Sequence, residues 1–78
     1  MPLSDLPLDR PATVVAIEEA PHGSGLEQRL AAMGVAVNRS VKVLRKAGWG
    51  GPLHVRVGAT TEIAIRRQEA ARVWVRWP

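Results

Sequence analysis

The sequence contains no cysteine, tyrosine or phenylalanine, and its aromatic side chains are three tryptophans. Without cysteine the chain has no disulfide bridge, no thiolate zinc site and no cysteine nucleophile. Three aromatics are too few for an extended platform on which bases could stack. Apolar runs such as 13–17 fall far below the ~20 residues that a membrane-spanning helix needs. The first ten residues contain acids and prolines where a signal peptide would be basic and apolar, so we expect a soluble, cytoplasmic protein.

The length and composition indicate one small folded unit. With 78 residues the chain has room for a single domain over 1–78 and for no second one. Its hydrophobic content of 46% is normal for a globular protein and too high for a disordered one. A domain of this size has a thin margin of stability, because a large share of its surface stays in water.

Charge is unevenly distributed along the chain, which has a net charge of +4. Residues 1–28 contain five carboxylates and one arginine, whereas residues 29–78 contain ten basic residues and two glutamates. Ordinary solvated surface would explain this distribution. The alternative is a basic face that meets nucleic acid, anionic lipid headgroups or an acidic protein.

Five short segments show the alternation of apolar and polar residues that is typical of half-buried strands. They lie at 13–18, 40–44, 53–57, 62–66 and 72–76, separated by turns such as the glycine-rich loop 47–52. This pattern predicts a mainly β fold, a small SH3-like barrel of about five short strands with one short helix inserted between strands 1 and 2. The predicted inward set is Val14, Ala16, Val41, Val43, Val55, Val57, Ile63, Ile65, Val73 and Val75.

The inserted helix is predicted from the stretch SGLEQRLAAMG, residues 24–34. Ser24 and Glu27 have the spacing of a capping box, and Gly34 stands where a left-handed residue ends a helix. Leu26, Leu30 and Met33 fall on one face. A helix of roughly nine residues is marginal alone, so this apolar stripe should pack over one open end of the barrel.

The residues that could support catalysis or hold a metal are few. His22 lies in a loop and His54 on the outer side of a strand, and neither has the spacing of a catalytic group or a ligand pair. We therefore expect that the protein is not an enzyme. His22 with Glu18 or Glu19, or His54 with a carboxylate on a neighbouring strand, would bind a divalent transition metal only loosely, or together with ligands from a second molecule.

A basic and aromatic face offers a route to nucleic acid, because arginines contact phosphates and tryptophan stacks on bases. Arginine stems covering tryptophan would explain the same residues. The candidates are Arg56, Arg66, Arg72, Trp74 and Arg76.

The order of these segments resembles the FeoA-type accessory proteins of bacterial ferrous iron transport. The resemblance covers LSDLPLDRPATVVAIE (3–18), LEQRLAAMGVAVNRSVKVL (26–44), GPLHVRVG (51–58) and EIAIRRQEAARVWV (62–75). The second stretch is the most distinctive, with a helix ending in arginine–leucine, a large apolar residue and glycine, then a turn into an alternating strand.

The chain departs from the family pattern at three turns. Asp9–Arg10 stands where the family usually has a glycine, Val37–Asn38 where proline–glycine is common, and Gly51 where an aspartate often precedes the proline. Asn38 is the best substitute for glycine at a left-handed position.

The resemblance implies a cytoplasmic SH3-like barrel that assists a membrane ferrous iron permease with a GTP-binding domain, and that lies at the inner face of the membrane through this partner. Exposed edge strands in so small a barrel would allow copies of the chain to pair, so a homo-oligomer is a further expectation. On the helix, the outward residues form the predicted contact surface: Glu27, Gln28, Arg29, Ala31 and Gly34. The alternatives are a nucleic-acid-binding barrel and a small protein that dimerises around a metal.

Overall fold

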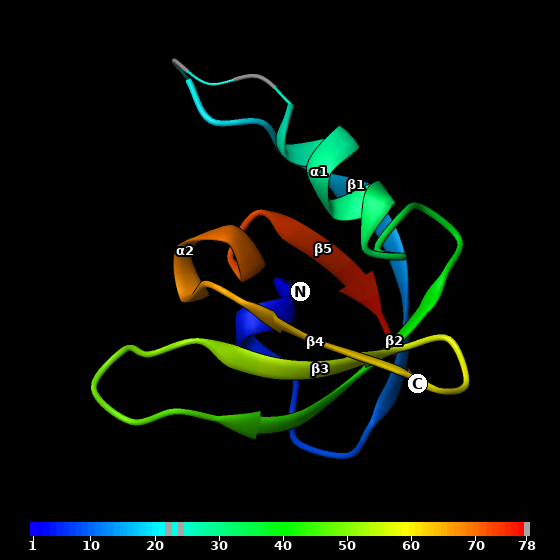
Figure 1. Cartoon of the computed structure of the whole chain (residues 1–78), viewed down its shortest axis with the longest axis vertical. Coiled ribbons are helices and arrows are strands. Elements are labelled where there is room, and N and C mark those ends of the chain that lie inside the picture. The colour runs from blue at the N-terminus through cyan, green and yellow to red at the C-terminus, as the bar shows by residue number, and fades with distance from the viewer. Residues whose placement is uncertain (22, 24, 78) are drawn as a thin grey trace.

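One antiparallel β-sheet organises the protein (Figure 1). The computed structural model describes residues 1–21, 23 and 25–77. Its strands are β1 Pro11–Ile17, β2 Ser40–Lys46, β3 Leu53–Val57, β4 Thr61–Ile65 and β5 Val73–Arg76. Its helical segments are the 3-10 turn η1 Leu3–Asp5, helix α1 Leu26–Ala32 and helix α2 Arg67–Ala70. Five strands with α1 inserted between β1 and β2 confirm the predicted SH3-like, mainly β fold.

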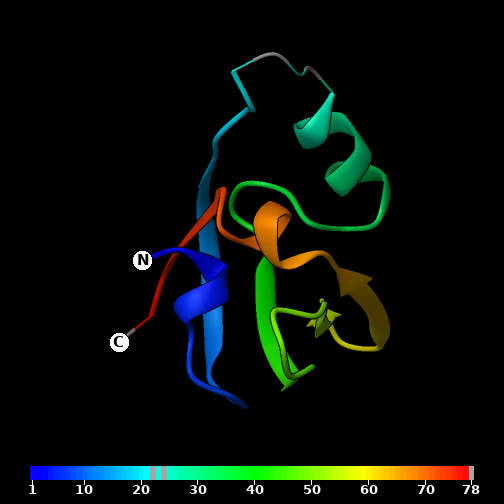
Figure 2. The same ribbon diagram turned by 90° about the vertical axis from the view of Figure 1, so that its left-hand side faces the viewer.

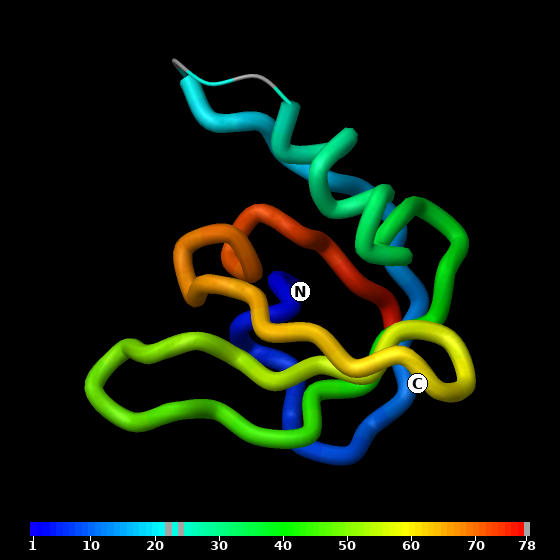
Figure 3. Tube along the Cα trace, viewed as in Figure 1, coloured from blue at the N-terminus to red at the C-terminus, as the bar shows by residue number. Residues whose placement is uncertain are grey.

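Strand β1 pairs with a different neighbour at each end. Its first residues pair with β2, from Pro11 opposite Lys42, and its last residues pair with β5, ending with Ile17 opposite Val73. The sheet order is therefore β4-β3-β2-β1-β5. Figures 2 and 3 show the resulting strong curvature, with α1 standing beyond one end of the sheet and above α2.

The two outer strands of the sheet differ in how they are covered. The Val75 N–H donates to the Met1 carbonyl at 2.8 Å, so the first residues of the chain cover β5. Strand β4 forms the other edge of the sheet. Edges of this kind invite pairing between copies, and the homo-oligomer stays a prediction.

The interior is apolar, and most of the residues that the alternation of apolar and polar positions predicts to face inward are buried. Eight of the ten residues in the predicted inward set are buried. Ala16 is exposed, so its prediction was wrong, because a β-bulge between Val14 and Ala16 shifts the alternation by one position, and Ile17 packs against the core in its place. Ile63 is half-buried and packs against the core. A single irregularity in β1 is enough to break strict alternation.

Several core residues come from segments without any alternation. Leu3, the first residue of η1, and Leu6, directly after it, are completely buried, as are Val35 after α1 and Ala70 in α2. A single 3-10 turn is too short to show a periodic pattern. These residues close the barrel from its two ends, which no count of alternating positions could reveal.

Helix α1 covers the core with the predicted stripe. Leu26 and Leu30 are buried and Met33 is half-buried against them. At its end Gly34 has φ 96°, and the Val35 N–H donates to the Leu30 carbonyl at 2.9 Å. This geometry confirms the predicted left-handed glycine and closes the last helical turn.

The start of α1 is held by a distant residue. The carboxylate of Glu19, just after β1, accepts hydrogen bonds from the Leu26 and Glu27 N–H groups, both at 3.1 Å. These donors are among those that a helix leaves unsatisfied at its start. The helix itself has seven residues, fewer than expected. The capping residue predicted from spacing, Ser24, lies outside the described residues.

Two of the three turns that use a non-glycine residue in the left-handed conformation are those where the chain departs from the family pattern. Asn38 has φ 74°, as its position in the family pattern predicts, and its N–H donates to the Val14 carbonyl at 2.8 Å. Asp9 has φ 63° in the turn before β1. Asparagine and aspartate tolerate this conformation better than other non-glycine residues, so the departures from the family pattern leave the turns intact.

Candidate functional site

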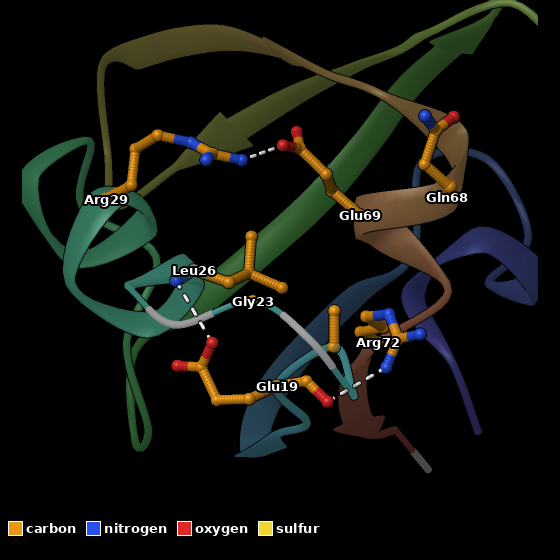
Figure 4. A pocket seen from close by; sticks show the side chains of 8 residues that line it. Glu19, Gly23, Leu26, Arg29, Gln68, Glu69 and Arg72 are labelled. Carbon is orange, nitrogen blue, oxygen red and sulfur yellow. Dashed lines mark hydrogen bonds and ion pairs between the residues drawn. The ribbon is translucent and has the colours of Figure 1, made fainter.

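A small pocket lies between the two helices, where the end of β1 and the start of β5 also meet (Figure 4). Its volume is about 200 Å³. Its main lining residues are Glu19, Leu26, Arg29, Gln68, Glu69 and Arg72. Leu26 supplies an apolar surface, and the charged residues surround it.

An ion pair joins the helices across this pocket. The Arg29 guanidinium of α1 contacts the Glu69 carboxylate of α2, and Figure 4 shows the two side chains pointing toward each other. The Glu69 side chain is only 17% exposed, whereas that of Arg29 is 58% exposed. A pair of this kind, in which one side chain is more than half exposed, adds roughly 0–1 kcal/mol to stability, so it favours this position of α1 over α2 only weakly.

Glu19 provides a second connection at the same place. Its carboxylate holds the start of α1, and its backbone carbonyl accepts a hydrogen bond from Arg72 Nη1 at 3.0 Å. One residue therefore links the end of β1, the start of α1 and the residue that precedes β5. Arg72, which the sequence placed on a basic face, serves here as a structural support.

The pocket suits a side chain better than a free small molecule. Typical small-molecule sites enclose ~300–1,000 Å³, and this one is smaller and open at its charged border. Oppositely charged residues alternate around it, so a polar or basic side chain from a partner would find acceptors, and an acidic one would find donors.

The residues predicted to contact a partner are exposed on the outer side of α1 and at its end. Glu27, Gln28, Arg29, Ala31 and Gly34 are all exposed on α1 or at its C-terminal end. Arg29 reaches the pocket between the helices. Their role in binding stays a prediction.

A second hollow adjoins the other end of α1. It has a volume of about 410 Å³, and Met33, Gly34, Arg39 and Gly58 are among its lining residues. Half-buried Met33 offers an adaptable apolar contact there. Hollows therefore adjoin α1 near its start and at its end.

The predicted basic and aromatic face is divided by the fold. Trp74 and Arg76 are exposed on β5, whereas Arg56 lies on β3, with β2 and β1 between these strands in the sheet. Arg66 is exposed at the start of α2. The Trp74 indole donates to Glu18 at 3.3 Å. The five candidates therefore lie on several elements. Two of them are paired with a carboxylate, Arg56 with Glu62 and Trp74 with Glu18. Trp74 is the only aromatic residue among the five.

A polar cluster on the outer side of the sheet surrounds His54. Arg45 Nη2 lies 3.0 Å from His54 Nδ1, and His54 Nε2 lies 2.8 Å from the Glu62 carboxylate. Because a guanidinium only donates, Nδ1 must accept and Nε2–H must donate to Glu62. Arg56 Nη2 donates to the other Glu62 oxygen at 2.9 Å. The hydrogen bond from Arg56, and next that from His54, lower the pKa of Glu62.

His54 and Glu62 are the histidine and neighbouring-strand carboxylate that the sequence suggested as a loose metal site, and metal binding there stays a prediction. Both ring nitrogens of His54 are engaged, and arginines stand beside them. Within residues 1–21, 23 and 25–77, no three His, Asp or Glu side chains gather as metal ligands would. The other histidine candidate, His22, lies outside the described residues.

Acid should weaken the protein partly through Glu62. Its pKa is lower in the folded state than the ordinary value of 4.5, so its stabilising contribution is present above that value and is lost as the pH falls through the lowered folded pKa. We expect Glu62→Gln to show a smaller loss of the free energy of unfolding than the wild type between about pH 5 and 3. Urea unfolding at a series of pH values measures this difference.

The matched control is Glu27→Gln, which removes an exposed carboxylate that has no ion pair among the described side chains. This variant should keep the pH dependence of the wild type. Identical acid profiles for Glu62→Gln and the wild type would mean that the cluster contributes nothing to stability.

Comparisons with known proteins agree on one family. A family model described as the FeoA domain matches residues 1–76. FeoA from Stenotrophomonas maltophilia, solved with zinc and described as an SH3 domain protein, is 35% identical, with 97% of this chain and 89% of that chain covered and a TM-score of 0.81. FeoA from Chlorobium tepidum is 30% identical, with coverage of 99% and 70% and a TM-score of 0.84.

A third solved structure, described as the iron uptake regulatory protein FeoA, is 32% identical over 97% of this chain and 95% of its own, with a TM-score of 0.83. The comparison with curated proteins gives no significant match. Among the described residues no helix has the length and apolar character needed to cross a bilayer.

Proposed function

The chain belongs to the FeoA domain family, and we propose on that basis that it docks on the cytosolic part of a GTP-binding ferrous iron permease and modulates its uptake or assembly. It is a small protein related to ferrous iron transport. Its family is one of small accessory domains and is not a known enzyme family. Docking would hold the protein at the cytoplasmic face of the membrane through its partner.

The observation that supports docking most directly is the fixed presentation of α1. The Arg29–Glu69 pair and the Glu19 carboxylate hold the helix at both its side and its start. A surface that is already ordered loses little conformational entropy when a partner binds. The exposed residues of α1 and the adjoining pocket are therefore the proposed interface.

The S. maltophilia relative supports the same role, since it is described as a candidate activating factor of ferrous iron transport. That protein was solved with zinc, and loose binding of a divalent transition metal stays a prediction for this chain. The described part of the chain has no cluster of three ligands. No part of the proposed docking depends on a bound metal.

Arg29→Glu tests the interface. The variant loses the pair with Glu69 and places a third carboxylate near Glu19 and Glu69. Like-charge contact opposes binding, so we expect affinity for the permease to fall about tenfold or more, equivalent to at least ~1.4 kcal/mol. The measurement is binding of the purified chain to the purified cytosolic domain of the permease, with a thermal melt to verify folding.

Arg76→Glu is the matched control, because it reverses one exposed cation on β5, away from α1. It should bind like the wild type. A loss confined to Arg76→Glu would move the interface to β5, and equal affinity of all three proteins would exclude both surfaces. Recovery of nucleic acid in place of the permease, lost at high salt, would favour the nucleic-acid alternative.

A further inference from the structure

The tip of the β2–β3 hairpin presents a tryptophan that the fold does not use. Trp49 is fully exposed, and it occupies a tight turn in which the Gly51 N–H donates to the Gly48 carbonyl at 3.1 Å. Figure 1 shows this hairpin projecting from the side of the molecule opposite α1 and the end of β5. An indole in this position contributes no buried area to folding.

The backbone at the tip is unfavourable for such a residue. Trp49 has φ 60° and Gly50 has φ 72°, so both central residues of the turn are left-handed. Hairpin turns of this type normally use asparagine, aspartate or glycine, and a bulky residue there is an outlier. Glycine at position 49 would form the turn without strain. Backbone strain of this kind gathers at functional sites.

The base of the tip is anchored, so the indole is presented at a defined place. Arg67 of α2 donates from Nη2 to the Ala47 carbonyl at 3.0 Å and from Nε to the Gly51 carbonyl at 3.3 Å. The Ala47 N–H also donates to the Pro52 carbonyl at 3.0 Å. The projecting turn is thus tied to the body of the protein on both of its sides.

The hairpin has charge of one sign only. Residues 40–57 include Lys42, Arg45, Lys46 and Arg56 and no aspartate or glutamate. In the last residues of β2, directly before the tip, Arg45 is exposed, whereas Lys46 is half-buried and its Nζ donates to the Ser4 carbonyl at 2.9 Å. Tryptophan prefers the boundary between water and lipid, and lysine and arginine are attracted to anionic headgroups.

We propose that the hairpin tip, through Trp49 and the exposed Arg45 beside it, binds the headgroup region of an anionic lipid bilayer. The indole enters the interface while the N–H groups of Arg45 that His54 does not accept contact lipid phosphates. This membrane contact is separate from the docking surface on α1 and needs no permease.

The remaining tryptophans favour a bilayer over a single-stranded nucleic acid. Stacking on successive bases requires several free aromatic faces. Arg10 lies over the Trp77 ring at 5.6 Å, and the Trp74 indole donates to Glu18. Trp49 stands alone on the hairpin, which suits insertion into an interface and gives no platform for neighbouring bases.

Vesicle binding tests the proposal with the protein alone. At low salt the wild type should bind vesicles of phosphatidylcholine and phosphatidylglycerol, and brominated lipids should quench part of its tryptophan emission. Trp49→Gly relieves the strained backbone and so keeps the fold. It should lose this quenching and bind roughly tenfold more weakly. Arg45→Gln should bind about fivefold more weakly, whereas the matched control Arg76→Gln should bind like the wild type.

Absence of binding at low salt, or equal binding by the wild type and Trp49→Gly, would overturn the proposal. So would equal binding to purely zwitterionic vesicles, because the hairpin cations would then have no role. Since no permease is present, these outcomes leave the docking proposal untouched, and failure of docking leaves the vesicle result untouched.

Discussion

Replacing Leu30 by aspartate should unfold the protein. Leu30 is completely buried on the inward side of α1, within the apolar cluster, and among the described residues no buried polar or charged residue is present to pair with a new carboxylate. Burying an unpaired carboxylate while losing the leucine contacts should cost roughly 3 kcal/mol or more. A domain of this length has only ~4–12 kcal/mol in total. Thermal unfolding followed by circular dichroism measures the loss.

Ala31→Asp is the matched control. It introduces the same carboxylate one position later in the same helix, on an exposed residue, and should change the free energy of unfolding by less than about 1 kcal/mol. A cooperative melt for Leu30→Asp at the wild-type temperature would contradict the role of α1 as a cover of the core.

Replacing Gly34 by alanine should produce the second large effect, because two costs add. Gly34 has φ 96°, which an L-residue adopts only at roughly 1–2 kcal/mol. A Cβ there would also lie 3.1 Å from Val57 Cγ2, and Val57 is buried and has little room to move. We expect a total loss of about 2–3 kcal/mol, measured by urea unfolding.

Gly25→Ala separates these two costs. Gly25 has nearly the same backbone conformation, φ 94°, but a Cβ at this position would meet nothing within 4 Å. The Gly25→Ala variant should therefore lose only the conformational part of the free energy of unfolding, about 1–2 kcal/mol. Equal losses for the two variants would mean that Val57 yields to the added methyl group, and that backbone conformation alone makes glycine necessary after α1.

The fold could be predicted from the sequence because its signals are local. Alternation predicted the strands, and the leucine spacing and Gly34 predicted α1 and its end, since each depends on residues only a few positions apart. The alternation failed at Ala16, where a bulge in β1 depends on how β5 pairs with it. Leu3 and Leu6 were missed because a single 3-10 turn has no period to detect.

The candidate site was predictable only in part. The sequence indicated that α1 has an outward side, and the residues named for it are exposed in the structure, whereas their role in binding stays a prediction. The pocket beside it could not be foreseen, because its ion pair joins Arg29 to a residue forty positions later, Glu69. The sequence predicted the glycine-rich loop 47–52 that contains Trp49, but it did not indicate the left-handed backbone of this residue.

Local chemistry along the chain thus decides which segments become strands, where α1 ends and which side of it faces the core, because hydrophobic period and backbone preference act over one or two turns. The tertiary structure alone decides that Glu19 holds the start of α1, that Arg29 meets Glu69 and that Arg67 braces the turn at Trp49. These contacts join residues that only the curling of the sheet brings together. Side-chain hydrogen bonds act over about 3 Å, whatever the separation along the chain.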